Sequence, residues 1–366
     1  MKNFKVILLW VISISAFAIS CRHSRDVERD EFEHPEVNSI YYWKTVFAPD
    51  SADYAFLRNH RIERIYLRMF DVVTDTASHG RQRTIPNASV VVPQTTYRQI
   101  TEMDSLKNTR FVPVVYVTLD VFKNLGYDWK DEIDRLASQI VKRVRNMCSF
   151  NGVQNVEGIQ LDCDWTVSNE EYFFYLCEAV KKQIVTDSLL WNLSSTIRLH
   201  QLRSSPPPVD YGTLMVYNTG SFNDINDKNS ILSRQAVLPY LKFLAGYPLH
   251  LDIAYPTYSW QLLFNDDHFV GIVNGLDLDD STNFSKLKDK KYLILNNMNY
   301  NGLEIPKGGI IKFENSDFKE IEFIKKEIET SLRSKPHGNV IYHLDMSNLS
   351  KFKNHEIDQI FAVDNP

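Results

Sequence analysis

Three polar side chains interrupt an apolar run at every second position in the stretch VEGIQLDCDWT, residues 156–166. They are Gln160, Asp162 and Asp164. Side chains at i, i+2 and i+4 of a β-strand share one face, with successive Cα atoms on it roughly 6.5–7 Å apart. Two carboxylates this close in a shielded site cannot both ionise without cost, so we expect one pKa to rise. Such a pair can divide the roles of proton donor and charged stabiliser.

The elements that must position this pair alternate between apolar β-rich runs and amphipathic helical stretches. Eight runs are predicted as strands, at residues 39–47, 62–70, 110–118, 156–164, 189–196, 212–218, 249–256 and 339–346. Apolar residues at helical spacing predict helices at 131–147, 168–184 and 317–333. Strands that alternate with helices favour a parallel sheet, and eight of them favour closure. The predicted fold class is therefore α/β, a (β/α)8 TIM barrel over residues 39–366.

The predicted strands are apolar on one face and polar on the other. The apolar set is expected to pack on the surrounding helices and includes Ile159, Leu161, Cys163, Val340, Tyr342 and Leu344. The polar set is expected to line the lumen and includes Arg68, Gln160, Asp162, Asp164, His343 and Asp345. Fully buried parallel strands are usually apolar on both faces, so this pattern indicates a lumen that leads into a site. Barrel enzymes carry their catalysts at the carboxyl ends of the strands, where Asp162 and Asp164 are expected.

Two segments depart from the simple repeat. Residues 71–93 are expected to form a long loop after the second strand. Residues 265–313 contain short β-like runs and are expected to form a small β-rich insertion between strands 7 and 8. Long loops after barrel strands are where this fold places binding surfaces.

The first twenty residues have the pattern of an export signal. Lys2 and Lys5 precede an apolar run too short for a spanning helix. The run ends in AISC, which resembles the lipobox of bacterial lipoproteins and implies cleavage before Cys21 and lipidation of Cys21. Residues 21–38 are charged and almost free of apolar side chains, as in a flexible tether. We therefore expect a protein lipid-anchored at the outer membrane or surface of a bacterial cell envelope.

The charge balance and the cysteines exclude several classes of function. The 41 basic residues less Lys2 and Lys5 leave 39 against 46 acidic ones, a net charge of −7 after cleavage. Nucleic acids and anionic membrane surfaces need clustered Lys and Arg, so neither is expected as a partner, apart from the membrane reached through the lipid. Cys148, Cys163 and Cys177 lack metal-ligand spacing. A Cys163–Cys177 disulfide bridge is one alternative, but we expect buried free thiols. We expect no metal and no cofactor.

The fourth predicted strand resembles the motif of family-18 glycoside hydrolases, Asp-Gly-x-Asp-x-Asp-x-Glu. The matching residues are Glu157, Gly158, Gln160, Asp162 and Asp164. The family's sixth strand carries Met-x-Tyr-Asp, and the corresponding residues here are Met215, Tyr217 and Asn218. The resemblance implies a (β/α)8 barrel acting on N-acetylhexosamine glycans. It implies Asp164 as proton donor, and Asp162 and Tyr217 as the groups that hold the substrate's acetamido group.

This chain departs from the family pattern at several positions. The family's acid is Glu, and Asp164 is one methylene shorter; Glu157, Gln160 and Asn218 replace three family aspartates. A donor displaced by ~1 Å can lose about two orders of magnitude in rate. Three functions stay open: a glycoside hydrolase, a non-catalytic glycan-binding barrel, and a barrel with other chemistry or a structural role. The overall layout also resembles a group of barrel lipoproteins of Bacteroidetes-type bacteria, which supports the fold and implies no activity.

Other polar and aromatic residues near predicted strand ends are candidate glycan contacts. The substrate-binding candidates are Trp43, Arg68, Gln160, Asn218, Tyr255, Trp260 and Asp345. Aromatic faces are suited to sugar rings, although aromatics are also common in cores. Arg68 and Asp71 are expected to form a salt bridge, and His343 and Asp345 a hydrogen-bonded pair. These alternatives make each residue either a ligand contact or a structural group.

Overall fold

The structure is a computed structural model that describes residues 34–75, 83–102, 106, 108–123, 125–333 and 335–363. Pro35–Pro366 form one compact unit. The expected signal peptide at residues 1–20, the lipidation site Cys21 and the tether up to residue 33 lie outside the described residues. Among the helices within the described ranges, none has the length and apolar character needed to cross a membrane.

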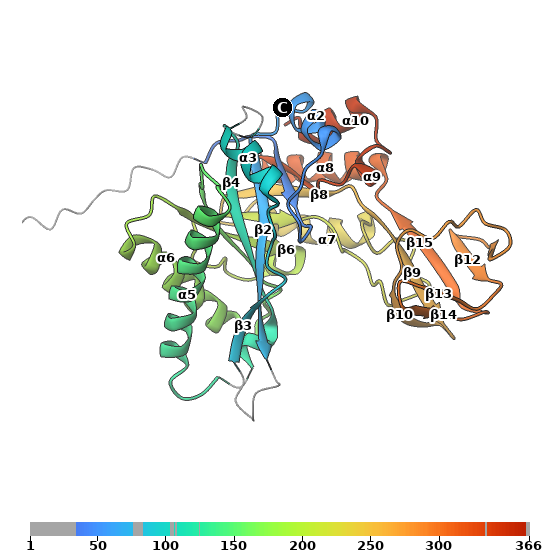
Figure 1. The fold of residues 1–366 in the computed structure, drawn as a ribbon, viewed down its shortest axis with the longest axis horizontal. Coiled ribbons are helices and arrows are strands. Elements are labelled where there is room, and N and C mark those ends of the chain that lie inside the picture. The colour runs from blue at the N-terminus through green and yellow to red at the C-terminus, as the bar shows by residue number, and fades with distance from the viewer. Residues whose placement is uncertain are drawn as a thin grey trace, which may run out of the picture. The chain divides into compact units, whose positions relative to one another are not determined.

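Eight parallel strands close into a barrel (Figure 1). Each pairs with the next, and the last, β16, pairs with the first, β1. In order around the barrel they are β1 (Ser39–Tyr42), β2 (Arg64–Asp75), β4 (Arg110–Val117), β5 (Gly158–Asp162), β6 (Asn192–Arg198), β7 (Tyr211–Met215), β8 (Leu251–Pro256) and β16 (Asn339–Tyr342). All eight predicted strands are present, which confirms the predicted (β/α)8 fold class.

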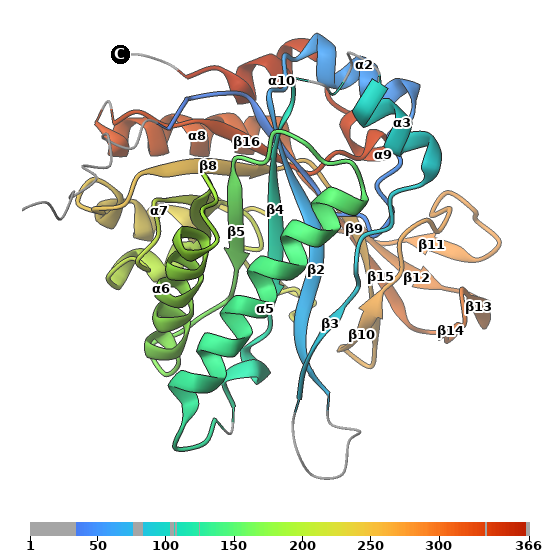
Figure 2. The same cartoon turned by 60° about the vertical axis from the view of Figure 1, so that its left-hand side comes forward.

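Helices cover the outside of the barrel. Figure 2 shows α5 and α6 lying over strands β4 and β5. In α5, residues at i, i+3 and i+7 such as Ile133, Leu136 and Ile140 are buried, so an apolar stripe attaches this amphipathic helix to the barrel. The helical elements are α2 (Ser51–Asn59), α3 (Gln94–Glu102), η1 (Leu119–Phe122), α5 (Trp129–Phe150), α6 (Glu170–Thr186), η2 (Leu199–Arg203), α7 (Arg234–Leu244), α8 (Phe318–Leu332), α9 (Met346–Leu349) and α10 (Asn354–Phe361).

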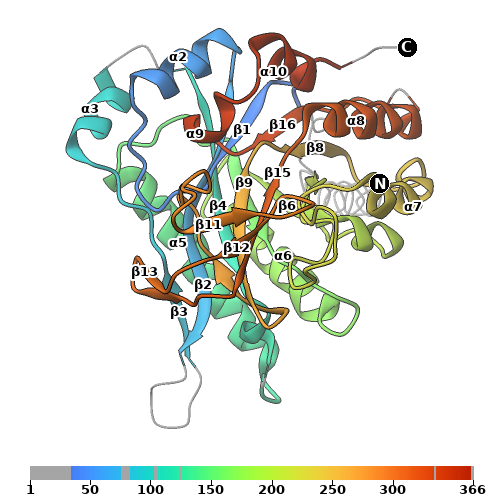
Figure 3. The same cartoon turned by 90° about the vertical axis from the view of Figure 1, so that its right-hand side faces the viewer.

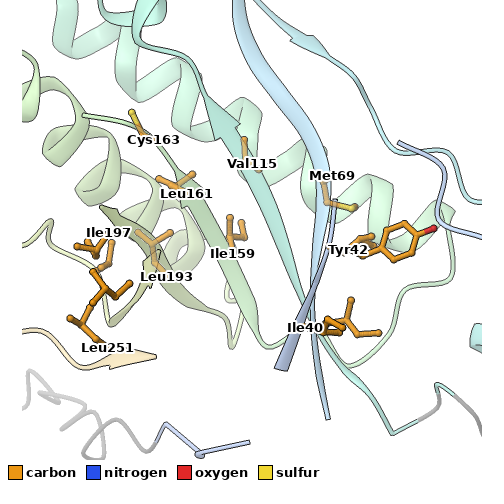
Figure 4. Close-up of a cluster of buried hydrophobic side chains, with 14 of the residues drawn as sticks. Ile40, Tyr42, Met69, Val115, Ile159, Leu161, Cys163, Leu193, Ile197 and Leu251 are labelled. Carbon is orange, nitrogen blue, oxygen red and sulfur yellow. The ribbon is translucent and has the colours of Figure 1, made fainter. Parts of the chain in front are cut away.

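The strands separate an outer core from an inner one. Ile159, Leu161 and Cys163 of the fourth barrel strand belong to the outer core between strands and helices, as predicted (Figure 4). The inner cluster instead contains Val340, with Tyr342 packed against it. The predicted parity of the eighth strand is therefore wrong at these two positions. Because β16 ends at Tyr342, alternation does not continue through the following segment, and Leu344 returns to the outer core.

A β-rich insertion follows β8 and is shown in front of the barrel in Figure 3. Its main sheet has the order β10-β9-β15-β12-β11, and a separate hairpin pairs β13 with β14. The strands are β9 (Ser259–Asn265), β10 (His268–Ile272), β11 (Phe284–Lys286), β12 (Lys291–Ile294), β13 (Met298–Tyr300), β14 (Leu303–Ile305) and β15 (Ile310–Asn315). It has its own apolar cluster, which includes Leu263, Ile294 and Ile311. The predicted insertion is confirmed, with sheet strands that begin at Ser259 and end at Asn315.

The predicted loop at residues 71–93 contains regular structure. β2 continues to Asp75, and β3 (Arg83–Asn87) pairs with it antiparallel, from Asp71 with Asn87 to Asp75 with Arg83. The expectation of an irregular loop is therefore wrong for this part. Val72 and Val73, which are β-branched residues, extend the strand beyond the apolar run that predicted it.

The three cysteines Cys148, Cys163 and Cys177 are free and buried. The prediction of buried thiols is confirmed, and the alternative Cys163–Cys177 bridge is not formed. Burial raises the pKa of all three thiols. They therefore act as small apolar side chains in the outer core.

Candidate functional site

The predicted carboxylate pair lies at the end of β5, beside the end of β6. The register between the two strands brings Thr196 next to Asp162 and Arg198 next to Asp164. Thr196 Oγ1 donates to Asp162 Oδ1 over 2.6 Å. Arg198 donates through Nη2 to Asp162 Oδ1 at 3.1 Å and through Nε to Asp164 Oδ1 at 2.5 Å. A single guanidinium therefore bridges both carboxylates.

The two carboxylates differ in burial. The Asp162 side chain is 5% exposed, whereas that of Asp164 is 46% exposed. Burial raises the pKa of Asp162 against the opposing effect of Arg198, and the charge of Asp164 adds to the rise. The expected rise of one pKa is thus found, and its main cause is loss of solvent rather than the neighbouring carboxylate. Tyr116 pairs in register with Asp162, and burial raises its pKa to about 12, so its hydroxyl stays protonated at neutral pH.

The bridge decides what Asp164 can do in this arrangement. Its oxygen accepts a hydrogen bond from a cation, the role of an ionised carboxylate, whereas a general acid must itself hold a proton. Arg198 Nη1 is buried and has no hydrogen-bond partner among the described residues. One cation therefore serves two carboxylates, and its contacts are to a single oxygen of each.

Tyr217 lies close to this cluster on the inner side of the barrel. Its hydroxyl donates to Met215 Sδ at 2.8 Å rather than to a carboxylate. Its ring stacks on that of Tyr342, with centroids 4.6 Å apart. Burial raises the pKa of Tyr217 well above its usual value, with smaller effects of Tyr342, Arg198 and Asp162. Tyr217 thus connects the carboxylate cluster to the aromatic side chains on the other side of the barrel mouth.

A cleft of about 240 Å³ opens between the barrel and the insertion. It is bordered by the segment after β7, by β9 and β10, and by the segment from the end of β16 into α9. We call this the barrel–insertion cleft. Its lining residues are Asn218, Tyr258, Ser259, Trp260, Ile272, Asn274, Tyr342, His343, Asp345 and Asn348.

Aromatic rings form one wall of the barrel–insertion cleft. Tyr258 packs edge-on against Trp260, with centroids 5.5 Å apart, and against Tyr342 at 5.8 Å. The Tyr258 hydroxyl donates to Asn218 Oδ1 at 2.5 Å, and the indole N–H of Trp260 donates to Glu314. Because their polar atoms are held by protein partners, these side chains present oriented ring surfaces. Such surfaces are suited to the apolar face of a sugar ring.

The opposite rim is polar and carries little free charge. Asp345 accepts from Ser347 and from Asn348 Nδ2, and Lys44 lies 3.7 Å away. Burial acts to raise the pKa of Asp345, but the Ser347 hydrogen bonds and Lys44 outweigh it, so the pKa is lowered. Burial lowers the pKa of His343 to about 4, so His343 is neutral at pH 7. The cleft therefore offers amide and hydroxyl groups with one stabilised carboxylate.

Several predicted contacts come together at the barrel mouth. Asn218, Trp260 and Asp345 all line the barrel–insertion cleft. Trp43 lies beside Tyr342, with ring centroids 5.8 Å apart, and belongs to the same inner aromatic group. The roles of these four residues toward a ligand stay predictions.

Arg68 forms the salt bridge that was expected. It donates to Asp71 through Nε at 3.0 Å and through Nη2 at 2.6 Å. Its guanidinium lies 5.2 Å from the Trp43 ring centroid. The prediction of an Arg68–Asp71 ion pair is confirmed, and Arg198 instead holds Asp162.

Two predicted ligand contacts are fully buried side chains that do not line the barrel–insertion cleft. Gln160 is fully buried, and its amide accepts from Tyr41 and donates to Thr213 and Ser194. Tyr255 is fully buried in the outer core. Both predictions are wrong: Gln160 lies below the barrel mouth, and Tyr255 faces the helices because it shares the parity of Ile253.

Four residues that build the candidate site were not predicted from the sequence: Arg198, Tyr258, Glu314 and Tyr342. Arg198 had a signal, because Ser194, Thr196 and Arg198 repeat the alternation of Gln160, Asp162 and Asp164, but the predicted strand ended at residue 196. Tyr342 was assigned to the wrong face. Tyr258 and Glu314 depend on how the insertion folds back, for which the sequence carried no pairing signal.

Glu157, which matches the first family aspartate, is also held within the barrel. Arg64 donates to both of its carboxylate oxygens, at 2.8 and 2.9 Å, and lies 3.5 Å from Asp252. The Arg64 side chain has no exposed surface. The first position of the motif is therefore part of a buried ion-pair network at the opposite end of β5 from Asp162.

Comparison with known proteins gave matches among solved structures. No family model matches the chain, and no curated protein matches it. The chitinase of Chromobacterium violaceum aligns with a TM-score of 0.53 and 11% identity, over 89% of this chain and 99% of that one. The spore cortex-lytic enzyme SleL of Bacillus cereus aligns with a TM-score of 0.51 and 11% identity, over 91% and 76% of the two chains.

A glycoside hydrolase family 18 N-acetylglucosaminidase of Paenibacillus barengoltzii also matches, over 89% of this chain and all of that one at 11% identity. Its TM-score of 0.46 is too low to carry an argument. At such identities the likeness concerns the fold alone. This chain therefore shares the (β/α)8 barrel of chitinase-like glycoside hydrolases.

Proposed function

We propose that this chain binds a glycan in the barrel–insertion cleft and does not cleave it. The observation that carries the proposal is the Arg198 bridge, which engages one oxygen of Asp162 and one of Asp164, while the aromatic side chains nearby line a cleft. In this arrangement one oxygen of each carboxylate accepts from a cation, whereas a general acid must itself donate a proton. Binding needs only the ring surfaces and hydrogen-bonding groups of the cleft, which are already oriented.

The proposed ligand is an N-acetylhexosamine-containing glycan. Trp260, Tyr258 and Tyr342 offer rings for sugar faces, and Asn218 and Asn274 offer amides for hydroxyl or acetamido groups. The fold shared with a chitinase supports this class by analogy. His343 is neutral at pH 7 and Asp345 is the carboxylate among the lining residues, while Lys44 and Lys351 are engaged at the rim by Asp345, Ser259 and Asn348.

Calorimetric titration with N-acetylchitopentaose tests the proposal. Trp260→Ala removes the largest aromatic side chain of the cleft and is expected to weaken binding about 30-fold, or about 2 kcal/mol. Trp129→Ala removes the same side chain from α5, on the outside of the barrel, and is expected to bind like wild type. Equal effects of the two substitutions, or wild-type affinity in Trp260→Ala, would rule out this cleft.

A second function, hydrolysis, is favoured by the exposure of Asp164. Because nearly half of its side chain is exposed, a bound glycan could displace Arg198 and leave Asp164 to take up a proton. Asp164 would then donate the proton, and Asp162 and Tyr217 would hold the acetamido group, as the family resemblance implies. New reducing ends formed from N-acetylchitopentaose by wild type, and absent with Asp164→Ala, would establish this function.

We also propose that the chain is anchored in the cell envelope through a lipid on Cys21, displayed at the outer membrane or cell surface. The support is the lipobox-like AISC sequence after a short apolar run. A labelled fatty-acid analogue fed to expressing cells is expected to enter wild type and not Cys21→Ala. Label in both proteins, or in neither, would contradict the anchor.

A further inference from the structure

A buried ion pair lies behind the aromatic wall of the barrel–insertion cleft. Lys312 and Glu314 belong to β15, and each is only 2% exposed. They are two residues apart, so their side chains point to the same face of the strand. Lys312 Nζ lies 2.7 Å from Glu314 Oε1. Ile311, the residue before Lys312, points to the other face of β15 and packs into the insertion's own core. The ion pair therefore faces away from that core.

The pair holds two segments that border the cleft. Glu314 Oε2 accepts from Trp260 Nε1 at 2.8 Å and from the backbone N–H of Ser230 at 3.0 Å. Ser230 Oγ donates to the same oxygen. Lys312 Nζ donates to the carbonyl oxygen of Asp224 at 3.3 Å. One ion pair thus fixes the Trp260 ring on β9 and both ends of residues 224–230 in the segment between β7 and α7.

The held segment in turn supports the same ring. Phe222 lies just before Asp224 and packs against Trp260, with ring centroids 6.2 Å apart. Asn229 Nδ2 donates to the carbonyl oxygen of Asn315, next to Glu314. Trp260 is therefore fixed at its indole nitrogen by Glu314 and at its ring by Phe222, and both constraints depend on β15.

Stability alone does not account for a buried Lys–Glu pair here. Removing two charges from water costs several kcal/mol, and well-packed apolar replacements are often neutral or stabilising. An apolar pair could not supply an acceptor for the backbone N–H and hydroxyl of Ser230, nor for the indole N–H of Trp260. The orientation of a ligand-facing ring is the property that Glu314 adds.

We propose that Glu314 is a positioning residue for glycan recognition, which fixes the plane of the Trp260 ring while Lys312 balances its charge. Glu314 does not line the cleft and acts through Trp260. This inference rests on the proposed glycan-binding function. It implies that the ligand meets a preorganised ring, so loss of Glu314 lowers affinity by freeing that ring.

Two double variants separate positioning from structural support. Lys312→Met/Glu314→Leu keeps an apolar pair of similar volume but removes the acceptor for the indole N–H. Lys312→Met/Glu314→Gln is the matched control, because the glutamine amide oxygen still accepts from Trp260. We expect N-acetylchitopentaose to bind about tenfold more weakly to the Leu variant and within about threefold of wild type to the Gln variant. The Leu variant should also unfold at a lower temperature, because Ser230 loses the same acceptor, so binding is compared well below both unfolding temperatures.

The indole N–H resonance of Trp260, assigned by its loss in Trp260→Phe, gives a readout that needs no glycan. Slow hydrogen exchange at this N–H is expected in wild type and in the Gln variant and fast exchange in the Leu variant. Unchanged exchange and affinity in the Leu variant would overturn the inference, as would equal losses of affinity and folding in both variants. If wild type binds no glycan but the exchange pattern holds, the proposed function fails and the positioning of the ring stands.

Discussion

Two regions of the barrel mouth treat their polar groups in opposite ways. At the ends of β5 and β6, Arg198 and Thr196 both donate to Oδ1 of Asp162, and Arg198 also donates to Oδ1 of Asp164. In the barrel–insertion cleft, the polar atoms of Tyr258 and Trp260 are held from behind, so that their rings face open space. In the first region the polar groups bind one another, whereas in the second region the aromatic rings line the cleft.

This contrast indicates which part of the barrel mouth is able to contact a ligand. The carboxylates occupy positions that match a catalytic motif, yet one oxygen of each already accepts hydrogen bonds from β6. The cleft matches no motif, yet it has space and oriented ring surfaces. Residue identity at a motif position is therefore a weaker guide to chemistry than whether the group is free to meet a ligand.

The largest expected effect comes from removing the cation of the first region. Arg198→Ala leaves the buried Asp162 without its ion-pair partner and next to Asp164. We expect the free energy of unfolding at pH 7 to fall by about 2–4 kcal/mol, below the full effect for a buried pair because Asp164 is partly exposed. Urea denaturation measures it.

A matched control is Arg145→Ala, which removes an arginine from a more exposed ion pair with Asp187. Its expected cost is below about 1 kcal/mol. Adding Asp162→Asn to Arg198→Ala should recover part of the loss, because no buried charge then stays unpaired. If Arg198→Ala lowers the free energy of unfolding no more than Arg145→Ala does, the Asp162–Asp164 region is not held together by charge, and its contrast with the cleft is lost.

In the barrel–insertion cleft, the neutral imidazole of His343 should make the stability of the protein depend on pH. The pKa of His343 is lowered by burial from 6.5 to about 4, with Asp345 raising it and Lys44 lowering it. The unfolded chain therefore binds a proton that the folded one does not between these pH values. Stability from this group is complete above pH 6.5 and is lost as the pH falls toward 4, by at most about 3 kcal/mol.

Unfolding of wild type and His343→Asn between pH 7.5 and 4.5 checks this sign. Wild type should lose more stability than the variant as the pH falls. Parallel profiles for the two proteins would show that His343 is protonated as easily in the folded cleft as in the unfolded chain.

The smallest expected effect sharpens the boundary of the cleft. Asn218 has a φ of 52°, so Asn218→Gly removes the amide without straining the backbone. We expect N-acetylchitopentaose to bind about fivefold more weakly, for the loss of a hydrogen bond worth about 1 kcal/mol. Asn301→Gly is the matched control, at a φ of 53° in the β13–β14 hairpin outside the cleft. Equal affinities for both variants would remove Asn218 from the site.

The fold was predictable because the hydrophobic period of the strands reports which face is buried. Apolar Ile159 and Leu161 against polar Gln160 and Asp162 were enough to orient the fourth barrel strand. The site was less predictable because it depends on contacts between distant segments. The Arg198 bridge depends on the register between β5 and β6, which brings together Asp164 and Arg198, 34 residues apart in the chain.

The errors follow the same physical division. The predicted alternation failed at Tyr342 because the strand ends there and the chain turns into α9. Tyr255 was taken as a ligand contact because it is aromatic and near a predicted strand end, although its parity with Ile253 already placed it toward the helices. Local alternation therefore carries information about faces, while the cleft is created by an insertion whose packing no local pattern reveals.

The proposal that the chain binds a glycan without cleaving it is tested by following binding and cleavage of N-acetylchitopentaose with the same preparation of wild-type protein. Calorimetry reports binding, and mass spectrometry of the recovered sugar reports cleavage. The Arg198 bridge and the open cleft predict saturable binding with the oligosaccharide recovered intact. Shorter products that form with wild type and disappear with Asp164→Ala would contradict this claim and make the carboxylate pair catalytic.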